Sequence, residues 1–582
     1  MPPPMSKRLQ LPITQWLPNY SKQWLGADAA AGLTVGIMLI PQGMAYAMIA
    51  GLPPVYGLYA ALIPQVVYAF LGTSRQLSVG PVAMDSLLVA SGLGALSLSS
   101  TEDYIQMALF LALFMGSLQF IFGLVRLGFF VNFLAKPVIS GFTSAAAIII
   151  GMSQLKYVLG IDIPRSNKLH EQLWNTWNLW EETHITSLVI CIGAILSILL
   201  LKRFFSKFPA ALGVTVLGIL ASYFFQWDQL GVSVVREIPS GLPSFQLPSF
   251  DYSAVQKLFP IALTLALIAF MEAISVAKAI EEKHKETTVL PNQELIALGM
   301  ANIIGALFQS YPTSGGFSRT AVNDQAGAKS QMSSIISASV IALTLVFFTP
   351  YFYYLPTAIL AAIIIIAVSG LIDWSYPLAL YKTRKDEFLL WLFTAAVTLS
   401  VGITQGIVAG VFVALILVIY RSSVPHIAIL GRIKNTNYYR NINRFQGEVE
   451  DPAGIVIFRF DSQLFFGNQA YFKQALWKAI EERKIPTQGV LFNLESVTHI
   501  DSTALFMLDD LIEKLQEKNI RTAMAGAIGP VRDILQQSPV WNHLGTEAFF
   551  ENTHSAYLWL NESIIPPSIE SKIALESNTK TT

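Results

Sequence analysis

Tyr311-Pro-Thr-Ser-Gly-Gly-Phe-Ser-Arg-Thr320 interrupts a chain that otherwise consists mostly of long apolar stretches. The segment places Arg319 at the start of a short helix at membrane depth. Irregular backbone is tolerated inside a bilayer only where protein or water surrounds it, and an unpaired arginine there is costly. A helix that begins in mid-membrane also presents free N–H groups and a partial positive charge. Both features predict a negatively charged ligand.

The composition is that of an integral membrane protein, because 53% of the 582 residues are hydrophobic and only 13% are charged. Lysine plus arginine and aspartate plus glutamate each number 38, so net charge gives no reason to expect binding to nucleic acid. The single cysteine, Cys191, excludes an internal disulfide, and no cluster of cysteine and histidine has metal-ligand spacing. We therefore expect no metal and no organic cofactor. The first long apolar stretch follows a proline-rich polar segment and continues into further spans, so a cleaved signal peptide is not expected.

Apolar stretches long enough to cross a bilayer predict about fourteen membrane spans. The predicted spans cover residues 29–48, 55–71, 82–98, 105–124, 138–159, 187–201, 210–225, 259–280, 295–308, a short segment from 318, 334–348, 357–371, 388–403 and 405–420. The domain boundaries that follow are a cytoplasmic N-terminal segment (1–25), a transmembrane domain (26–425), a linker (426–434), a small α/β domain (435–562) and a disordered tail (563–582).

Positively charged residues favour one side of the predicted spans. With a cytoplasmic N-terminus, Arg75, Arg126, Lys202 and Arg384 fall on the same side as the N-terminus, whereas the opposite loops carry few, such as Arg236. The positive-inside rule makes the richer side cytoplasmic. An even number of spans then returns the C-terminus to the cytoplasm. The compact linker and the lack of large insertions indicate a bacterial plasma membrane.

A second break, Ser78-Val-Gly-Pro-Val-Ala-Met-Asp85, precedes the third predicted span, as the first break precedes the tenth. If the fourteen spans form two repeats of seven, the third and the tenth spans lie at equivalent positions in the two repeats. Interrupted segments at equivalent positions mark the substrate site of inverted-repeat transporters, where each half-helix aims its N-terminus at the midplane. The alternative is that Gly80-Pro81 and Gly315-Gly316 are kinks or packing sites in continuous helices.

Four motifs resemble those of the sulfate permease (SulP) family of anion transporters: Pro41-Gln-Gly-Met-Ala-Tyr46, Gly51-Leu-Pro-Pro-Val-Tyr-Gly-Leu-Tyr59, Ser78-Val-Gly-Pro-Val82 and Gly316-Phe-Ser-Arg-Thr-Ala-Val322. The resemblance covers nearly the whole chain. It implies a helical membrane protein of two inverted seven-span repeats, divided into a core domain with the anion site and a gate domain. It also implies a cytoplasmic STAS domain, a homodimer and an elevator-like motion of core against gate.

The same resemblance implies an anion pocket lined by Gln42, Tyr46, Val82, Ala83, Glu272, Phe317, Ser318 and Arg319. The chemistry of these residues fits that role independently. The first N–H groups of the two half-helices, the Gln42 amide and the Ser318 hydroxyl are neutral donors, and the planar guanidinium of Arg319 suits paired oxygens. Neutral donors matter because the ion must also leave. Alternatively, Arg319 is structural and is held by a backbone carbonyl or by lipid headgroups.

Two acidic residues are candidates for coupling transport to another ion. Glu272 follows apolar residues, and we expect it to pair with Arg319 when the site is empty and to take a proton when an anion occupies Arg319. The alternative is a carboxylate that only packs between helices. Asp85 lies in the first turn of the third span, where it either points away, as a helix cap or a partner for another span, or faces the pocket and repels a divalent anion.

The resemblance leaves the substrate and the coupling ion open. Sulfate is the expected anion, and bicarbonate, chloride, nitrate and small dicarboxylates are alternatives. A bicarbonate-transporting branch of the family couples to sodium and has small or hydroxyl residues where this chain has Arg319. A fixed cation at that position favours proton symport or anion exchange over sodium coupling.

The region 435–562 predicts alternating strands (455–460, 489–494) and helices (469–483, 503–518) of a small α/β domain. Ile500-Asp-Ser-Thr-Ala-Leu505 resembles the loop of STAS domains in which a serine is phosphorylated, and Ser502 is the matching position. The alternative is that Asp501 or Ser502 is a helix N-cap. We expect this domain to be regulatory and to bind a cytoplasmic partner.

Two other classes of protein compete with a transporter. A membrane-anchored sensor or scaffold would bind the anion and signal through the STAS domain, but it would not need paired breaks. An enzyme is not expected, because the sequence shows no nucleophile with a positioned base, no metal set and no phosphate-binding loop. An uncoupled channel remains open within the transporter class.

Overall fold

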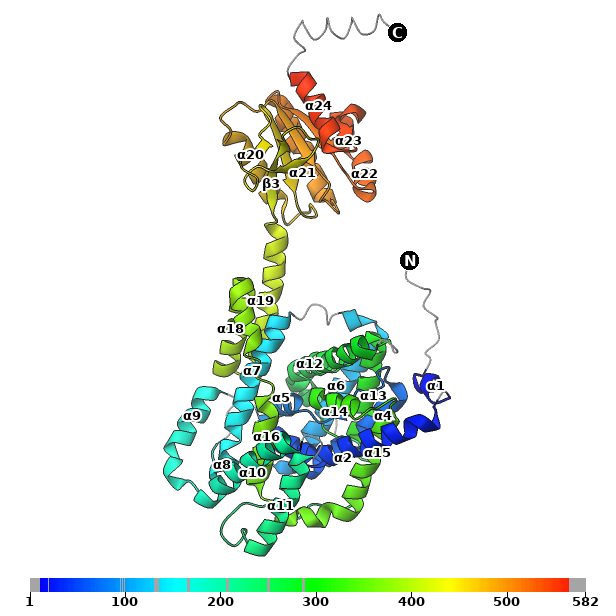
Figure 1. Ribbon diagram of the computed structural model, residues 1–582, viewed down its shortest axis with the longest axis vertical. Coiled ribbons are helices and arrows are strands. Elements are labelled where there is room, and N and C mark those ends of the chain that lie inside the picture. Colours follow the sequence, from blue (N-terminus) through cyan, green and yellow to red (C-terminus); the bar gives the residue numbers. More distant parts are fainter. Residues whose placement is uncertain are drawn as a thin grey trace, which may run out of the picture. The chain divides into compact units, whose positions relative to one another are not determined.

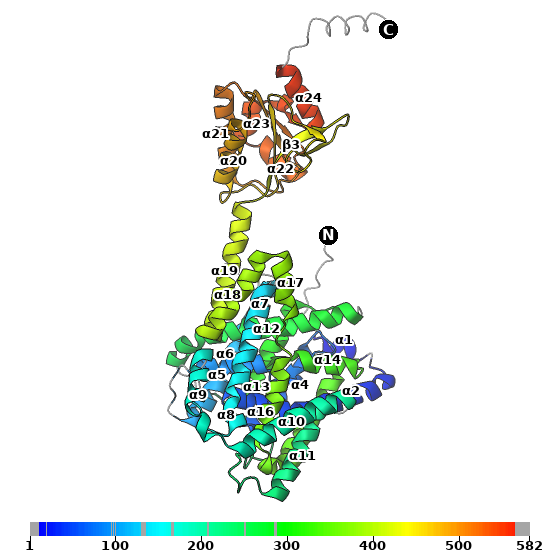
Figure 2. The ribbon, with the colours of Figure 1, turned by 60° about the vertical axis from the view of Figure 1, so that its left-hand side comes forward.

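The computed structural model describes residues 11–18, 20–94, 96, 98, 100–129, 135–164, 168–205, 209–248, 252–284 and 288–564. The chain divides into two compact units, Met1–Ala414 and Leu415–Thr582, and Figures 1 and 2 show the helices of the first and the mixed sheet of the second. The predicted tail 563–582 lies almost entirely outside the described residues, as does most of the segment before residue 11.

Fourteen helical segments in the described part of the chain correspond to the fourteen predicted spans. They are α2 (Lys22–Ala50), α3 with α4 (Val55–Ala60, Ile63–Leu71), α5 (Ala83–Gly94), α6 (Thr101–Leu124), α7 with α8 (Lys136–Ser153, Leu155–Leu159), α10 (Ile185–Phe204), α11 (Ala210–Phe225), α12 (Tyr252–His284), α13 (Pro291–Leu307), α14 (Phe317–Gln325), α15 (Met332–Leu343) with the turns Thr344–Phe348 and Thr349–Tyr354, α16 (Thr357–Ser369), α18 (Lys385–Ser400) and α19 (Ile403–Ser423). The short helices α1 (Ile13–Trp16), α9 (Leu169–Asn178) and α17 (Ser375–Thr383) lie between or before them.

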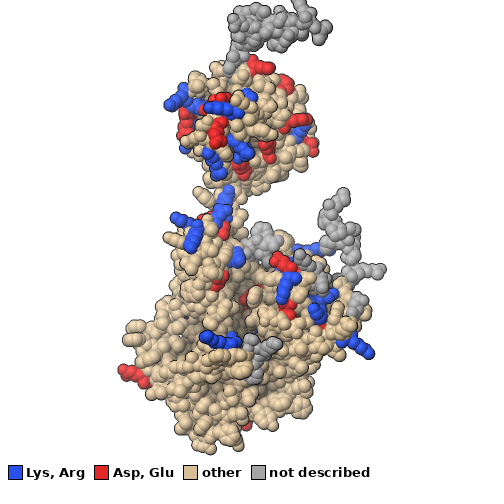
Figure 3. Space-filling model, viewed as in Figure 1, with Lys and Arg blue, Asp and Glu red and all other residues tan. Residues whose placement is uncertain are grey.

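Seven of the described helices are long and apolar enough to cross a membrane by length and composition alone. The short ones, α5 and α14, are the third and tenth segments, as the two breaks in the sequence predict. The visible face of the first unit in Figure 3 carries few charged side chains, whereas the second unit carries many. A surface of this kind fits contact with lipid tails.

The two breaks meet in a two-stranded antiparallel ribbon. Strand β1 (Val79–Gly80) pairs with β2 (Ser314–Gly315), so that Val79 lies opposite Gly315. The ribbon is extended by hydrogen bonds from the Gly316 N–H to the Ser78 carbonyl and from the Ser78 N–H to the Thr320 hydroxyl, both 3.0 Å long. Because each strand leads directly into a half-helix, the ribbon sets the N-termini of α5 and α14 at one place in the protein.

Glycine allows the first two spans to pack closely. A Cβ atom on Gly57 of α3 would lie 1.9 Å from the Gly43 carbonyl oxygen of α2, so the two backbones touch where a larger residue cannot fit. At the end of α2, Gly51 adopts the left-handed conformation (φ 84°) and terminates the helix. The close contact holds the part of α2 that carries Gln42 and Tyr46.

The second unit is built on a seven-stranded sheet. Its strands are β3 (Ile427–Ile433), β4 (Tyr439–Asn441), β5 (Val449–Glu450), β6 (Ile455–Phe460), β7 (Gly489–Asn493), β8 (Arg521–Ala525) and β9 (Phe549–Phe550), in the order β4-β3-β6-β7-β8-β9, with β5 also pairing with β3. Strands β6 to β9 are parallel, and β3 is antiparallel to β6.

Helices cover both faces of this sheet because buried side chains alternate along its strands. Val456 and Phe458 of β6 pack with α20 (Gln469–Glu481), α21 (Ser502–Glu517), α22 (Gly529–Gln536) and α23 (Pro539–Leu544), while Ile455 and Ile457 pack with α24 (Thr553–Ile564). The predicted strands 455–460 and 489–494 and helices 469–483 and 503–518 are confirmed to within two residues.

Candidate functional site

A cavity of about 660 Å³ lies in the membrane unit, in front of the two half-helices. It is lined by Gln42, Tyr46, Val82, Ala83, Glu272, Phe317, Ser318 and Arg319, so the structure brings together all eight residues predicted to line the pocket. These residues come from α2, the start of α5, α12 and the start of α14. The first N–H groups of a helix have no partner within the helix, and here two helix N-termini border the same cavity.

The cavity extends toward one face of the membrane unit. Thr34 lies in the first half of α2, Lys202 near the end of α10, Ala210 at the start of α11 and Leu371 just after α16, and all four line the cavity. Each of these positions is on the side that carries the N-terminus when the spans alternate. The positive-inside rule assigns that side to the cytoplasm.

Arg319 is the buried cation at the inner end of this cavity. Its side chain is 2% exposed, and Nη1 donates a hydrogen bond of 2.6 Å to the Pro81 carbonyl oxygen, in the segment that leads into α5. Nε and Nη2 have no hydrogen-bond partner. The carbonyl contact thus orients the guanidinium without using all its donors. The two remaining donors are left without a partner inside the protein, beside the cavity that Arg319 lines.

The predicted ion pair between Glu272 and Arg319 is not formed. Among the described residues, the ion pairs with N···O distances up to 4.0 Å do not include this pair, and Glu272 Oε2 has no hydrogen-bond partner. Gln42 Oε1, on the other side of the cavity, is also without a partner. Buried polar atoms are normally satisfied, so these unpaired atoms mark a site that is completed by a solute or by water.

Several polar residues of the cavity were not identified from the sequence. Ser275 lies one turn after Glu272 on α12, and Thr143 faces the cavity from α7. Helical spacing from Glu272 could have identified Ser275. Lys202 was predicted only to be a charge on the cytoplasmic side. Its place at the cavity depends on how α10 packs against other helices, such as α16, which the sequence does not show.

Asp85 does not line the cavity, which favours the first of the two alternatives for its direction. It lies in the first turn of α5, two residues after Ala83, with its side chain 0% exposed. Neither carboxylate oxygen has a hydrogen-bond partner. Asp85 therefore does not act as a hydrogen-bonded helix cap.

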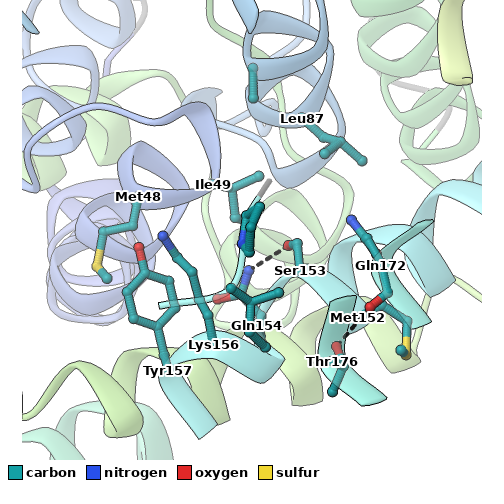
Figure 4. Close-up of a pocket in the computed structure, with 13 residues that line it drawn as sticks. Met48, Ile49, Leu87, Met152, Ser153, Gln154, Lys156, Tyr157, Gln172 and Thr176 are labelled. Atoms are coloured by element: carbon teal, nitrogen blue, oxygen red, sulfur yellow. Dashed lines mark hydrogen bonds between the residues drawn. The ribbon is translucent and has the colours of Figure 1, made fainter. Parts of the chain in front are cut away.

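A smaller cavity, of about 60 Å³, lies toward the opposite face (Figure 4). Its wall includes Met48 of α2, Leu87 of α5 and Gln154, Lys156 and Tyr157 near α8. It shares no lining residue with the large cavity. Met48 and Leu87, which line this smaller cavity, are both buried.

In the second unit, Asp501 is the N-cap of α21, as one of the alternatives for this loop predicts. Its Oδ1 accepts a hydrogen bond of 2.8 Å from the Ala504 N–H, and Oδ2 accepts one of 2.9 Å from the Phe466 N–H. Ser502, the first residue of α21, is exposed. The cap fixes the loop and leaves the Ser502 side chain at the surface.

Two half-helices that meet head to head beside a buried arginine, at the end of a cavity open to one face, define an anion carrier of the inverted-repeat class. The chain belongs to the sulfate permease family, whose model matches residues 25–394, and a STAS domain matches residues 446–556. The family is one of transporters and not of enzymes.

The relatives and solved structures agree with this assignment. The chain is 39% identical over 564 residues to "Sulfate transporter 4.1, chloroplastic" of Arabidopsis thaliana, covering 94% of this chain and 82% of that protein. The inward-facing structure of the murine Solute Carrier 26 family member A9 anion transporter matches with a TM-score of 0.87 at 24% identity, covering 95% of this chain and 94% of that one. The transmembrane domain of the cyanobacterium bicarbonate transporter BicA matches with a TM-score of 0.59 at 24% identity, covering 68% of this chain and 98% of that domain. The fold is therefore that of two inverted seven-span repeats followed by a STAS domain.

Proposed function

We propose that this protein is a secondary active transporter of sulfate that works by proton symport, with anion exchange as its mode when no proton gradient is present. The observation that carries the proposal is the unpaired part of Arg319, which offers two donors beside two helix N-termini in one cavity. A doubly charged tetrahedral oxyanion can accept from both the guanidinium and the helix N–H groups. The names of the Arabidopsis relatives support the choice of sulfate.

The site residues divide the work of binding. Arg319 supplies charge and paired donors, Ser318 adds a hydroxyl, and Ala83 stands at the first free N–H groups of α5. Gln42 donates through its amide nitrogen. The site has one cation and several neutral donors. It therefore binds the anion strongly enough for the anion to enter and weakly enough for it to leave.

Glu272 is the proposed coupling residue. It lines the cavity with Arg319 without pairing with it, and it takes a proton when an anion occupies the guanidinium. When the anion has left, the carboxyl loses its proton and pairs with Arg319, which lets the empty site return. Sodium has no part in this cycle.

The movement that exposes the site to each side is an elevator-like displacement of a core domain, including α5, α12 and α14, against a gate domain. We assign the smaller and the larger cavity, which share no lining residue, to the two sides of that interface. We also propose a homodimer in a bacterial plasma membrane with both termini in the cytoplasm. The STAS domain binds a cytoplasmic regulator, and Ser502 is its candidate modification site.

Uptake of labelled sulfate into proteoliposomes tests the proposal. An acidic outer solution should drive accumulation above the equilibrium level in wild-type protein, and replacing sodium with potassium or choline should leave the rate unchanged. Glu272→Gln should weaken accumulation driven by the pH gradient and spare counterflow exchange. Gradient-driven accumulation at the wild-type level in Glu272→Gln would contradict the coupling role.

The same assay separates a transporter from a sensor or a channel. A sensor binds sulfate but accumulates none, and a channel conducts current in planar bilayers without accumulation against a gradient. Competition by bicarbonate, chloride, nitrate and dicarboxylates would rank the alternatives for the substrate.

A further inference from the structure

Asp85 is a buried acid that the proposed cycle does not yet use. Its side chain is 0% exposed, and both carboxylate oxygens lack a hydrogen-bond partner. Another buried carboxylate of the membrane unit is treated differently: Glu294 accepts hydrogen bonds from the Tyr68 hydroxyl (2.7 Å) and the Thr73 N–H (2.7 Å). The lack of partners at Asp85 is therefore not a general property of buried acids in this protein.

The ionisable groups around Asp85 come from several elements. Glu272 of α12 and Arg319 of α14 act on it electrostatically, and so does Tyr311 in the segment before β2. Tyr46 of α2 acts on Arg319 and Glu272 at the same site. The neighbouring Ser86 shares a hydrogen bond of 3.0 Å with the Tyr311 hydroxyl, so that hydroxyl pair does not satisfy the Asp85 carboxylate.

An ionised Asp85 would be expensive in this conformation. A buried carboxylate without a hydrogen bond or an ion pair costs several kcal/mol, and the usual outcome is that the group takes a proton. Arg319 does not offset this cost with a hydrogen bond to Asp85, because its Nη1 donates to the Pro81 carbonyl. A site with one cation, Arg319, and two neutral acids, Asp85 and Glu272, suits the arrival of an anion.

A count of charges then sets the number of protons. With sulfate bound and both acids protonated, Arg319 and the anion together carry one negative charge. With the anion gone and both acids ionised, Arg319 and the two carboxylates also carry one negative charge. The moving part of the protein thus has the same charge in both directions only if two protons travel with each sulfate.

We propose that Asp85 is a second proton-carrying group and that each sulfate moves with two protons, so that transport is electroneutral. This inference rests on the proposed function of the same site. On the side of high proton concentration the Asp85 carboxylate takes a proton from hydronium and leaves water, and on the other side the carboxylic acid returns the proton to water as hydronium. Since Asp85 lies behind the wall of the cavity, it carries its proton without competing with the anion for Arg319.

The experiment measures the pH difference that balances a known sulfate gradient in proteoliposomes, with the membrane potential clamped by potassium and valinomycin. A tenfold gradient represents about 1.4 kcal/mol, which two protons balance across about half a pH unit. We call the pH difference at which there is no net sulfate flux the balance point. We expect the wild-type balance point at about half a pH unit, unaffected by the membrane potential. Asp85→Asn should move it to about one pH unit and make uptake faster with an inside-positive potential.

Controls separate this inference from the proposed function. Asp85→Glu keeps a protonatable group and should keep the wild-type balance point, and Asp228→Asn removes an exposed carboxylate outside the cavity. Absence of sulfate counterflow in wild type would overturn the proposed function. Intact counterflow with a wild-type balance point near one pH unit, or an Asp85→Asn balance point that stays near half a unit, would overturn the role of Asp85. If Asp85→Asn fails to fold, the wild-type balance point still decides.

Discussion

Removing the Arg319 guanidinium should weaken sulfate binding by about two orders of magnitude. Arg319 keeps Nε and Nη2 without partners in the cavity, so sulfate can accept two hydrogen bonds from a charged donor. A hydrogen bond to a charged group contributes about 1.5–3 kcal/mol, and the loss of two such bonds therefore costs at least about 3 kcal/mol. At about 1.4 kcal/mol for each factor of ten, Arg319→Ala raises the Kd for sulfate about 100-fold.

Arg319→Lys should have a smaller effect, because a lysine retains the charge but not the planar pair of donors. We expect a rise in Kd of about 10-fold, since one of the two charged hydrogen bonds is lost. Both variants also leave the Pro81 carbonyl without the Nη1 donor.

The assay is calorimetric or fluorescence titration of purified protein with sulfate, with gel filtration to verify folding. Arg203→Ala is the matched control, because Arg203 is an exposed arginine at the end of α10 that does not line the cavity. If folded Arg319→Ala protein bound sulfate within threefold of wild type, Arg319 would be structural and the site would have to lie elsewhere.

Three other changes probe the cavity mouth, the helix packing and the STAS domain. Lys202→Gln removes a cation that lines the cavity near the end of α10 and should raise the KM for sulfate on the side to which the cavity extends a few-fold at low salt, with the difference lost at high salt, in flux assays from each side of the membrane. Gly57→Ala places a Cβ atom against the Gly43 carbonyl and should destabilise the membrane unit by about 3 kcal/mol, seen as a lower Tm; an unchanged Tm would argue against the close contact. Burial opposes ionisation of Asp461, but hydrogen bonds from Arg459 and His426 outweigh it and hold the pKa of that carboxyl below its usual value. A lowered folded pKa stabilises the domain above about pH 4 and ceases to do so as the pH falls through the folded value, so Asp461→Asn should reduce amide protection of β6 by about 1 kcal/mol at neutral pH and have no effect in strong acid.

Much of the membrane unit is predictable because its determinants are local. Apolar length gives the spans, and the Gly-Pro and Gly-Gly breaks identify the two half-helices before any coordinates are known. Seven of the eight cavity residues lie in the motifs around Gln42, Gly80 and Arg319, and the family resemblance adds Glu272. The direction of each side chain does not follow from the motifs, because it depends on packing between segments far apart in sequence.

Asp85 and Glu272 illustrate this difference. Their sequence neighbours show that both acids lie at membrane depth, but not that Asp85 is excluded from the cavity or that Arg319 prefers the Pro81 carbonyl to Glu272. In the STAS domain, β3 and α24 were not predicted. Strand β3, seven residues long, lies in the segment 426–434 that the sequence suggested as a linker, and its place beside β6 depends on pairing with a strand far along the chain.

The ribbon formed by β1 and β2 has a consequence for biogenesis. Its partners, Val79 and Gly315, are synthesised more than two hundred residues apart, so the first half of the chain leaves the ribosome with its polar break unpaired. At twelve residues, α5 rises about 18 Å and is too short to cross a hydrocarbon layer of about 30 Å. The nascent first repeat must therefore be sheltered by the insertion machinery or by water until the second repeat arrives, and the two halves, produced as separate polypeptides, should assemble only when they are made together.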